Sequence, residues 1–151
     1  MSPAAQAPRR LQFDLPGDMP ALMGQVRSIE AFLREAGCSA ASARQMAVVA
    51  EEVLANILRD AWPGREPGHC AVDVDAARRD GAIMVTLRTE DDGIAFDPTA
   101  TASPDLDASL DEREVGGLGI FLVRSMTDTQ HYRRVDGHNI FEVSKACPAR
   151  D

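Results

Sequence analysis

A turn-rich stretch, residues 91–98, reads DDGIAFDP and directly follows a strand-like run. Asp91, at the end of that run, can accept a hydrogen bond from an exocyclic amino group, and Gly93 has no side chain that would block a flat base. This combination suits adenine, and we expect Phe96 to anchor the loop in the core. The alternative is a plain turn, because Asp and Gly are the commonest turn residues.

Upstream of this stretch, residues 51–56 read EEVLAN within a helical pattern. At a spacing of four, Glu52 and Asn56 lie on one face of a helix. A glutamate can accept a proton from an incoming hydroxyl, and the asparagine oxygen can join a magnesium ion held by phosphates. The alternative is a solvated helix face, because Glu is a good helix former and the motif is short.

Downstream, residues 116–119 read GGLG at the start of an apolar helical run. Glycines at a helix start expose backbone N–H groups at the positive end of the helix dipole, which favours phosphate. Alone, such a run also fits a flexible loop without a ligand. The order and spacing of the three segments place each at the mouth of one cleft, which favours a nucleotide site.

The remaining periodicity predicts the elements that surround these segments. Strands are expected over 9–15, 70–76, 82–89, 130–135 and 139–145, and helices over 20–36, from Ser39 or Ser42 to Trp62, and over 120–126. Residues 99–115 are polar and acidic and are expected to form a lid-like loop. Helices and strands come in blocks, which favours an α+β two-layer sandwich with a mainly antiparallel sheet.

Composition limits the classes of function. The chain has 151 residues, of which 44% are hydrophobic, and this predicts one domain with one core. A net charge of −8 disfavours direct binding of nucleic acid or anionic lipid. The N-terminal residues lack an apolar signal region and no long apolar run follows, so a cytoplasmic protein is expected. Three scattered cysteines indicate neither a disulfide framework nor a zinc site.

Taken jointly, the three segments resemble the N box and the two glycine boxes of the GHKL ATP-binding superfamily, which includes gyrase, heat-shock chaperones, histidine kinases and MutL. The C-terminal part of the chain looks more narrowly like the anti-sigma-factor serine kinases of the RsbW and SpoIIAB type. The residues that carry this resemblance are 117–124 and Asp128, followed by Tyr132, 137–139 and Lys145. The resemblance implies the Bergerat ATP-binding fold, with a mixed but mostly antiparallel sheet and helices on one face.

The resemblance also divides the chain. It implies a disordered N-terminal tail over 1–8, a single kinase domain over 9–146 with an ATP lid at about 97–115, and a C-terminal tail over 147–151. Two positions depart from the family pattern. Asp60 stands where relatives commonly have His, and Arg113 is the only basic residue close to the glycines, where some relatives have a basic residue directly before them.

By this resemblance the site holds ATP and Mg²⁺. Glu52 would be the general base that prepares a protein serine, and Asn56 would coordinate the magnesium ion. Asp91 would bind the adenine amino group, and Gly93 would let the base lie close. The other expected ATP-binding positions are Phe96, Arg113, Gly116, Gly117, Leu118 and Gly119.

The implied function is an ATP-dependent serine/threonine protein kinase in a partner-switching system. Its substrate would be the serine of a small antagonist protein with a STAS domain, and it would sequester a regulatory partner such as a sigma factor; a homodimer is left open. One alternative is a non-catalytic regulator that binds ATP, or has lost it, and acts by sequestration alone. A histidine-kinase fragment is less favoured, because no histidine lies in either N-terminal helix.

Overall fold

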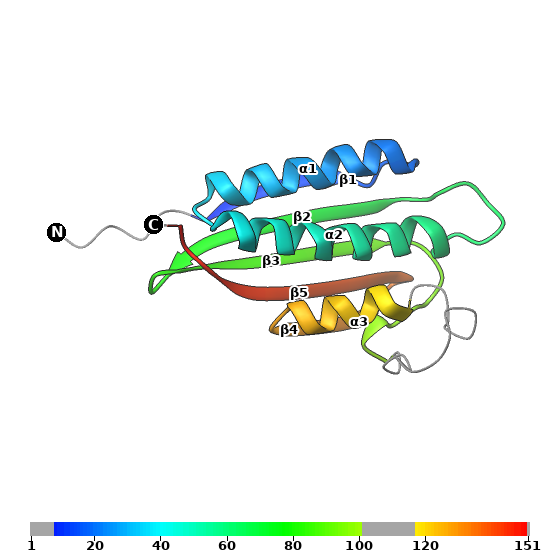
Figure 1. The fold of residues 1–151 in the computed structure, drawn as a ribbon. Coiled ribbons are helices and arrows are strands. Elements are labelled where there is room, and N and C mark those ends of the chain that lie inside the picture. Colours follow the sequence, from blue (N-terminus) through cyan, green and yellow to red (C-terminus); the bar gives the residue numbers. More distant parts are fainter. Residues whose placement is uncertain (1–7, 101–116, 151) are drawn as a thin grey trace.

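A computed structural model describes residues 8–100 and 117–150 of the chain (Figure 1). The elements in chain order are β1 (Arg9–Asp14), α1 (Met19–Glu35), α2 (Ala40–Asp60), β2 (Cys70–Arg79), β3 (Ala82–Asp91), the short 3-10 helix η1 (Pro98–Ala100), α3 (Gly117–Met126), β4 (Thr129–Val135) and β5 (His138–Pro148). Most of the expected lid, residues 101–115, lies outside the described residues.

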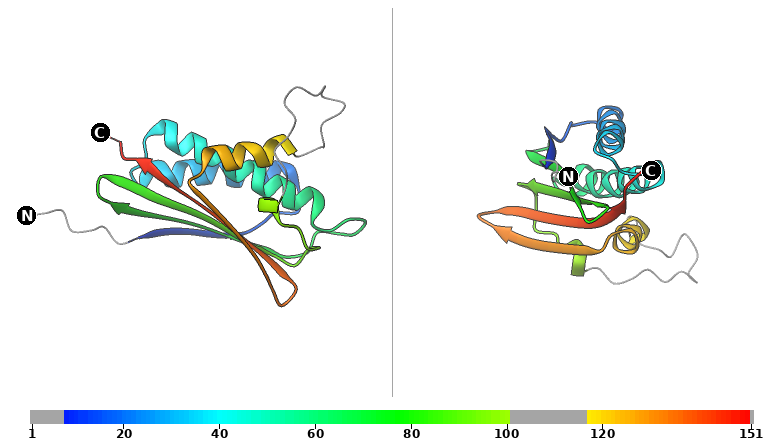
Figure 2. Two further views of the ribbon diagram at one scale, coloured as in Figure 1. Left: turned by 90° about the horizontal axis from the view of Figure 1, so that it is seen from below. Right: turned by 90° about the vertical axis from the view of Figure 1, so that its left-hand side faces the viewer.

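The strands form one sheet in the order β1-β2-β3-β5-β4. All four neighbouring pairs are antiparallel, so the described sheet is not mixed. Helices α1, α2 and α3 cover one face of this sheet, and the other face is open (Figures 1 and 2). The prediction of an α+β two-layer sandwich with helices on one face is confirmed.

Local sequence explains where the helices begin and which side they bury. The Asp18 carboxylate accepts a hydrogen bond from the Ala21 N–H at 2.8 Å and caps α1. Of the two candidate caps for α2, Ser39 is the one used: its Oγ accepts from the Ser42 N–H at 3.2 Å. Helix α1 buries the apolar stripe that its periodicity predicts, which is Leu22, Val26, Ile29 and Leu33.

The hairpins and the chain end complete the sheet. Asp136 and Gly137 both have positive φ, at 50° and 80°, which is the geometry of a tight antiparallel turn between β4 and β5. Strand β5 continues to Pro148, two residues into the range that we expected to be a C-terminal tail. The extension follows from packing, because Cys147 is fully buried and the Ser39 N–H donates to the Pro148 carbonyl at 3.1 Å.

Alternation along β3 leads from the core to the site. Val85 and Leu87 point into the layer between sheet and helices and are buried. The next two inward positions, Thr89 and Asp91, are equally buried but polar. Polar side chains at inward positions of a strand end mark the place where the apolar core gives way to a polar cavity.

Candidate functional site

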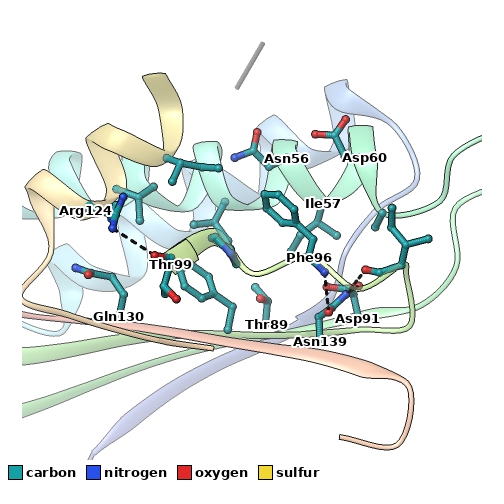
Figure 3. A pocket seen from close by; sticks show the side chains of 17 residues that line it. Asn56, Ile57, Asp60, Thr89, Asp91, Phe96, Thr99, Arg124, Gln130 and Asn139 are labelled. Atoms are coloured by element: carbon teal, nitrogen blue, oxygen red, sulfur yellow. Dashed lines mark hydrogen bonds between the residues drawn. The ribbon is translucent and has the colours of Figure 1, made fainter. Parts of the chain in front are cut away.

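A cavity lies between the C-terminal half of α2, helix α3 and the ends of β3 and β5 (Figure 3). Its apolar walls are Val53, Ile57, Ile120, Val123 and Phe141. Its polar lining includes Asn56, Asp60, Thr89, Asp91, Arg124, Gln130 and Asn139. An apolar pocket with a few converging polar groups is the usual form of a small-molecule site.

Asp91 lies on the floor of this cavity and is only 5% exposed. Its Oδ1 accepts hydrogen bonds from the Gly93 N–H at 2.9 Å and from Asn139 Nδ2 at 3.0 Å. The second bond follows from strand register, since Asp91 of β3 is paired with Asn139 of β5. The carboxylate is therefore held in one orientation by the backbone of its own turn and by the neighbouring strand.

Asn139 is the centre of the floor and is 4% exposed. Its Nδ2 donates to Asp91 Oδ1 at 3.0 Å and to the Ile94 carbonyl at 2.7 Å, and its Oδ1 accepts from the Phe96 N–H at 3.3 Å, Tyr132 Oη at 2.6 Å and Arg134 Nη1 at 2.9 Å. These bonds fix the loop after β3 to the β4–β5 hairpin. Sequence reasoning had used Asn139 only as part of a family resemblance and had given it no role.

Thr89, also on the floor, was missed by sequence reasoning. It is 1% exposed, and its Oγ1 has no hydrogen-bond partner among the described residues. The signal that could have identified it is alternation: an inward threonine interrupts an otherwise apolar row on β3. An unpaired buried hydroxyl is uncommon and calls for an explanation.

Gly93 has a packing role that the sequence did not reveal. A Cβ placed on it would lie 2.5 Å from both the Cβ and the carbonyl oxygen of Ala61. The adjacent Ile94 N–H donates to the same Ala61 carbonyl at 2.9 Å. Glycine at this position therefore lets the loop press against the C-terminal end of α2.

Phe96 does not anchor the loop in the core, and that expectation was wrong. Its side chain is 47% exposed and lines the cavity. In Figure 3 it stands near Ile57 and Asn56, above the polar floor. The loop is held instead through the Phe96 backbone N–H, which donates to Asn139 Oδ1, so the ring is free to face the opening.

The rim on α2 combines an amide and an ion pair. Arg59 Nη2 donates to Asn56 Oδ1 at 2.7 Å and to Asp60 Oδ2 at 2.8 Å. The hydrogen bonds that Arg59 donates to the Asp60 carboxylate raise the pKa of Arg59 above its usual range. Asp60, at the position where the resemblance implied a histidine, thus holds an arginine against the amide oxygen expected to bind magnesium.

The predicted base lies against the start of α3. Gly119 is buried, and a Cβ placed on it would overlap Oε2 of Glu52. Glu52 of α2 is half-buried, and its carboxylate lies against the first turn of α3, close to the expected phosphate-binding glycines. Of those glycine-box positions, Arg113 and Gly116 lie outside the described residues, and only the helical backbone is described for Gly117 and Leu118.

Further hydrogen bonds join the elements around the cavity. Arg124 Nη2 of α3 donates to the Thr99 carbonyl at 3.3 Å, which joins α3 to η1. On the other side, Asp92 Oδ1 accepts from Trp62 Nε1 at 2.8 Å and from the His69 N–H at 3.0 Å. The Trp62 hydrogen bond lowers the pKa of Asp92. Trp62 is buried, as expected of a residue that packs the end of α2.

The described part of the chain contains no group of three or more His, Cys, Asp or Glu side chains that could hold a metal ion. Over the same ranges, no helix is both long and apolar enough to cross a bilayer.

Comparison with known proteins identifies the family in which this geometry is found. The family model of the histidine kinase-like ATPase domain matches residues 18–145. The serine/threonine-protein kinase BtrW of Bordetella bronchiseptica is 37% identical over 94 residues, which cover 62% of this chain and 63% of BtrW. The chain thus spans less than two thirds of that relative.

One solved structure shows the same fold at low identity. The SiaB-SiaC complex from Pseudomonas aeruginosa aligns with a TM-score of 0.53 and 19% identity, covering 90% of this chain and 89% of the other. The histidine kinase domain from Erythrobacter litoralis EL346 blue-light activated histidine kinase gives 0.43 and 19%, over 70% of this chain and 45% of that one. The family match runs from the cap of α1 into β5 and includes the whole cavity, so the chain belongs to the histidine kinase-like ATPase family.

Proposed function

We propose that this protein binds ATP with Mg²⁺ in the cavity and transfers the terminal phosphate to a serine or threonine of a small partner protein. One observation carries the proposal above all. A buried carboxylate, Asp91, is fixed on the floor of an apolar cavity that α3 also lines, and the first turn of α3 lies against the Glu52 carboxylate. Such a site has one end for a base and another for phosphates.

The floor supports adenine as the base. A carboxylate accepts hydrogen bonds only, so Asp91 complements the exocyclic amino group of adenine. Among the described residues, both hydrogen bonds to Asp91 go to Oδ1, which leaves Oδ2 for a ligand. The unpartnered Thr89 hydroxyl lies on the same floor, and the walls of Val53, Ile57 and Phe141 suit a flat ring.

The opposite end supports phosphates and a magnesium ion. Helix α3 begins at Gly117, and the unpaired N–H groups at a helix N-terminus favour phosphate. Mg²⁺ commonly takes one or two protein oxygens and completes its shell with water and phosphate oxygens, and Asn56 Oδ1 suits that role. When bound, the ion would neutralise charge on the phosphates.

Glu52 is proposed as the general base. It would accept the proton of the acceptor hydroxyl as that oxygen attacks the terminal phosphorus. Its position against Gly119 supports this role, because the carboxylate then lies beside the start of α3, where the phosphates are proposed to bind.

The proposed partner follows from the relatives. BtrW is named a serine/threonine-protein kinase, and SiaB is found in complex with SiaC. We extend this to a STAS-domain antagonist as phosphate acceptor, a sequestered regulator such as a sigma factor, a homodimeric assembly and a cytoplasmic location. The net charge of −8 argues against direct contact with nucleic acid.

A second candidate is a regulator that binds ATP without transferring phosphate. Arg59 favours it, because its guanidinium occupies Asn56 Oδ1 and is itself held by Asp60. Magnesium binding at Asn56 requires that contact to break.

The first experiment is calorimetric titration of the purified protein with ATP and Mg²⁺, repeated on Asp91→Asn. We expect saturable binding that Asp91→Asn weakens about 10- to 150-fold through loss of a charge-assisted hydrogen bond. Asp92→Asn is the matched control, because Asp92 faces Trp62. Unchanged affinity in Asp91→Asn would remove adenine from this floor.

Incubation with radiolabelled ATP and each small STAS-domain protein of the same genome then separates the two candidates. Label on a serine or threonine of one of these proteins supports the kinase. ATP binding without label on any of them favours the non-catalytic regulator.

A further inference from the structure

Thr89 has a buried hydroxyl that the fold leaves without a partner. The side chain is 1% exposed, and its Oγ1 makes no hydrogen bond to any described residue. Folded proteins rarely tolerate this, because the group loses its water and gains nothing in return. Valine has nearly the same shape and would fill the position without that cost. The hydroxyl therefore needs an explanation other than packing.

Its position supplies the explanation. Thr89 lines the cavity together with Asp91 and Asn139, and Figure 3 shows it on the sheet side between Gln130 and Asn139. Thr89 and Asp91 are two residues apart on β3, so both point to the same face of the sheet, about 7 Å apart along the strand. The hydroxyl thus lies beside the carboxylate proposed to bind the amino group of adenine.

Nearby polar groups do not compete for this hydroxyl. Asn139 uses its amide on Asp91, Ile94 and the β4–β5 hairpin. Gln130 donates its amide N–H to Thr127 Oγ1 at 2.6 Å. The floor therefore has one fixed acceptor, Asp91, and one uncommitted hydroxyl, Thr89.

Resting on the proposed function, we propose that Thr89 is a base-recognition residue: its hydroxyl donates a hydrogen bond to a ring nitrogen of adenine next to the amino group, directly or through one ordered water. Adenine carries an acceptor nitrogen beside its amino donor, which matches a hydroxyl beside a carboxylate. Guanine presents a carbonyl oxygen at the position of that amino group and would set an acceptor against Asp91. Thr89 and Asp91 together read adenine.

The test is calorimetric titration of Thr89→Val, Thr89→Ser and wild type with ATP and Mg²⁺. We expect Thr89→Val to weaken ATP binding about 2- to 12-fold, the usual effect of one hydrogen bond, and Thr89→Ser to keep wild-type affinity. Thr86→Val is the matched control. Thr86 lies on the same strand but points to the open face of the sheet, so its substitution should leave affinity unchanged.

Two further measurements distinguish base recognition from a structural role. Without nucleotide, the thermal midpoint of Thr89→Val should equal or exceed that of wild type, because the substitution removes an unpaired polar group. With 1-deaza-ATP or 7-deaza-ATP, wild type should lose affinity for the analogue that lacks the contacted nitrogen, whereas Thr89→Val should lose none. The analogue titration of wild type alone remains informative if the variant does not fold.

The outcomes are separable. Equal ATP affinity in wild type and Thr89→Val overturns the role of Thr89 and leaves ATP binding intact. A lower thermal midpoint with unchanged affinity also overturns it, since the hydroxyl would then serve the fold. Absence of ATP binding in wild type defeats the proposed function itself, and the role of Thr89 with it.

Discussion

The floor and the rim of the cavity are built in different ways. On the floor, Asp91 and Asn139 come from two paired strands, are at most 5% exposed and are bonded to backbone groups. On the rim, Asn56, Arg59 and Asp60 lie within two turns of one helix, and the Arg59–Asp60 ion pair is 43% and 58% exposed. The fold therefore fixes the floor, where we propose that the base binds, whereas the rim, which we propose for magnesium, depends on solvated side chains that can change partners.

The largest expected effect is on the reaction and not on binding. Glu52→Ala should lower the rate of phosphate transfer about 100-fold or more, because it removes the proton acceptor, while the affinity for ATP stays within about twofold. Initial rates of phosphoserine formation and calorimetry measure the two quantities. Glu51→Ala, one residue away on the same helix, is the control. Equal loss of rate and affinity would exclude Glu52 as the base.

Two asparagines test the comparison directly. Asn139→Ala should reduce the free energy of unfolding by about 2–3 kcal/mol, because it leaves Asp91, Tyr132 and loop backbone groups without a buried partner. Asn56→Ala should change it by less than about 0.5 kcal/mol, because its contact with Arg59 is exposed. Urea unfolding followed by circular dichroism gives both values. Similar losses would show that rim and floor are equally rigid.

Substitutions of two glycines test the comparison between the two parts of the cavity further. Gly93→Ala should cost about 1–3 kcal/mol of stability, because the new Cβ meets the backbone of Ala61, which cannot move aside. Gly119→Ala should cost less, because its Cβ meets only the flexible end of Glu52, yet it should slow phosphate transfer by displacing that carboxylate. A Gly119→Ala variant with full activity would contradict the placement of Glu52.

The smallest effect is a pH dependence at the edge of the floor. Folding lowers the pKa of Asp92, so this carboxylate stabilises the protein above its unfolded pKa, and the contribution disappears as pH falls through the folded value. Asp92→Asn should therefore unfold at lower urea than wild type at pH 7, and the gap should shrink below about pH 4. A gap of constant size from pH 7 to pH 3 would assign the effect to packing.

The sequence predicted the elements well because their causes are local. The Asp18 cap, the apolar stripe of α1 and the Asp136–Gly137 turn each depend on residues close together in the chain. The hydrogen bonds of Asn139 have a non-local cause. Asn139 contacts Asp91, which is 48 residues away in the chain, because the register of β3 and β5 pairs the two residues. Alternation within one strand does not reveal which strand lies beside it.

Phe96 and Thr89 show the limit of hydrophobic patterning. Phe96 was expected to anchor the loop in the core. Instead, its backbone N–H is held by a hydrogen bond to Asn139, and its ring lines the cavity. Thr89 was only the last residue of an expected strand and was given no role, although its hydroxyl lacks a partner among the described residues. Both residues depart from the hydrophobic pattern at the cavity. Such departures are expected where a site, and not the packing of the core, determines the residue type.

Trp62 is the chain's only tryptophan, and its indole N–H donates to Asp92, the residue next to Asp91. Indole emission depends on the polarity and hydrogen bonding of the ring's surroundings. A molecule that engages Asp91 therefore acts one residue away from a single intrinsic fluorophore. The protein carries its own optical reporter, so nucleotide titrations and stopped-flow binding rates can be recorded on the unlabelled wild-type chain.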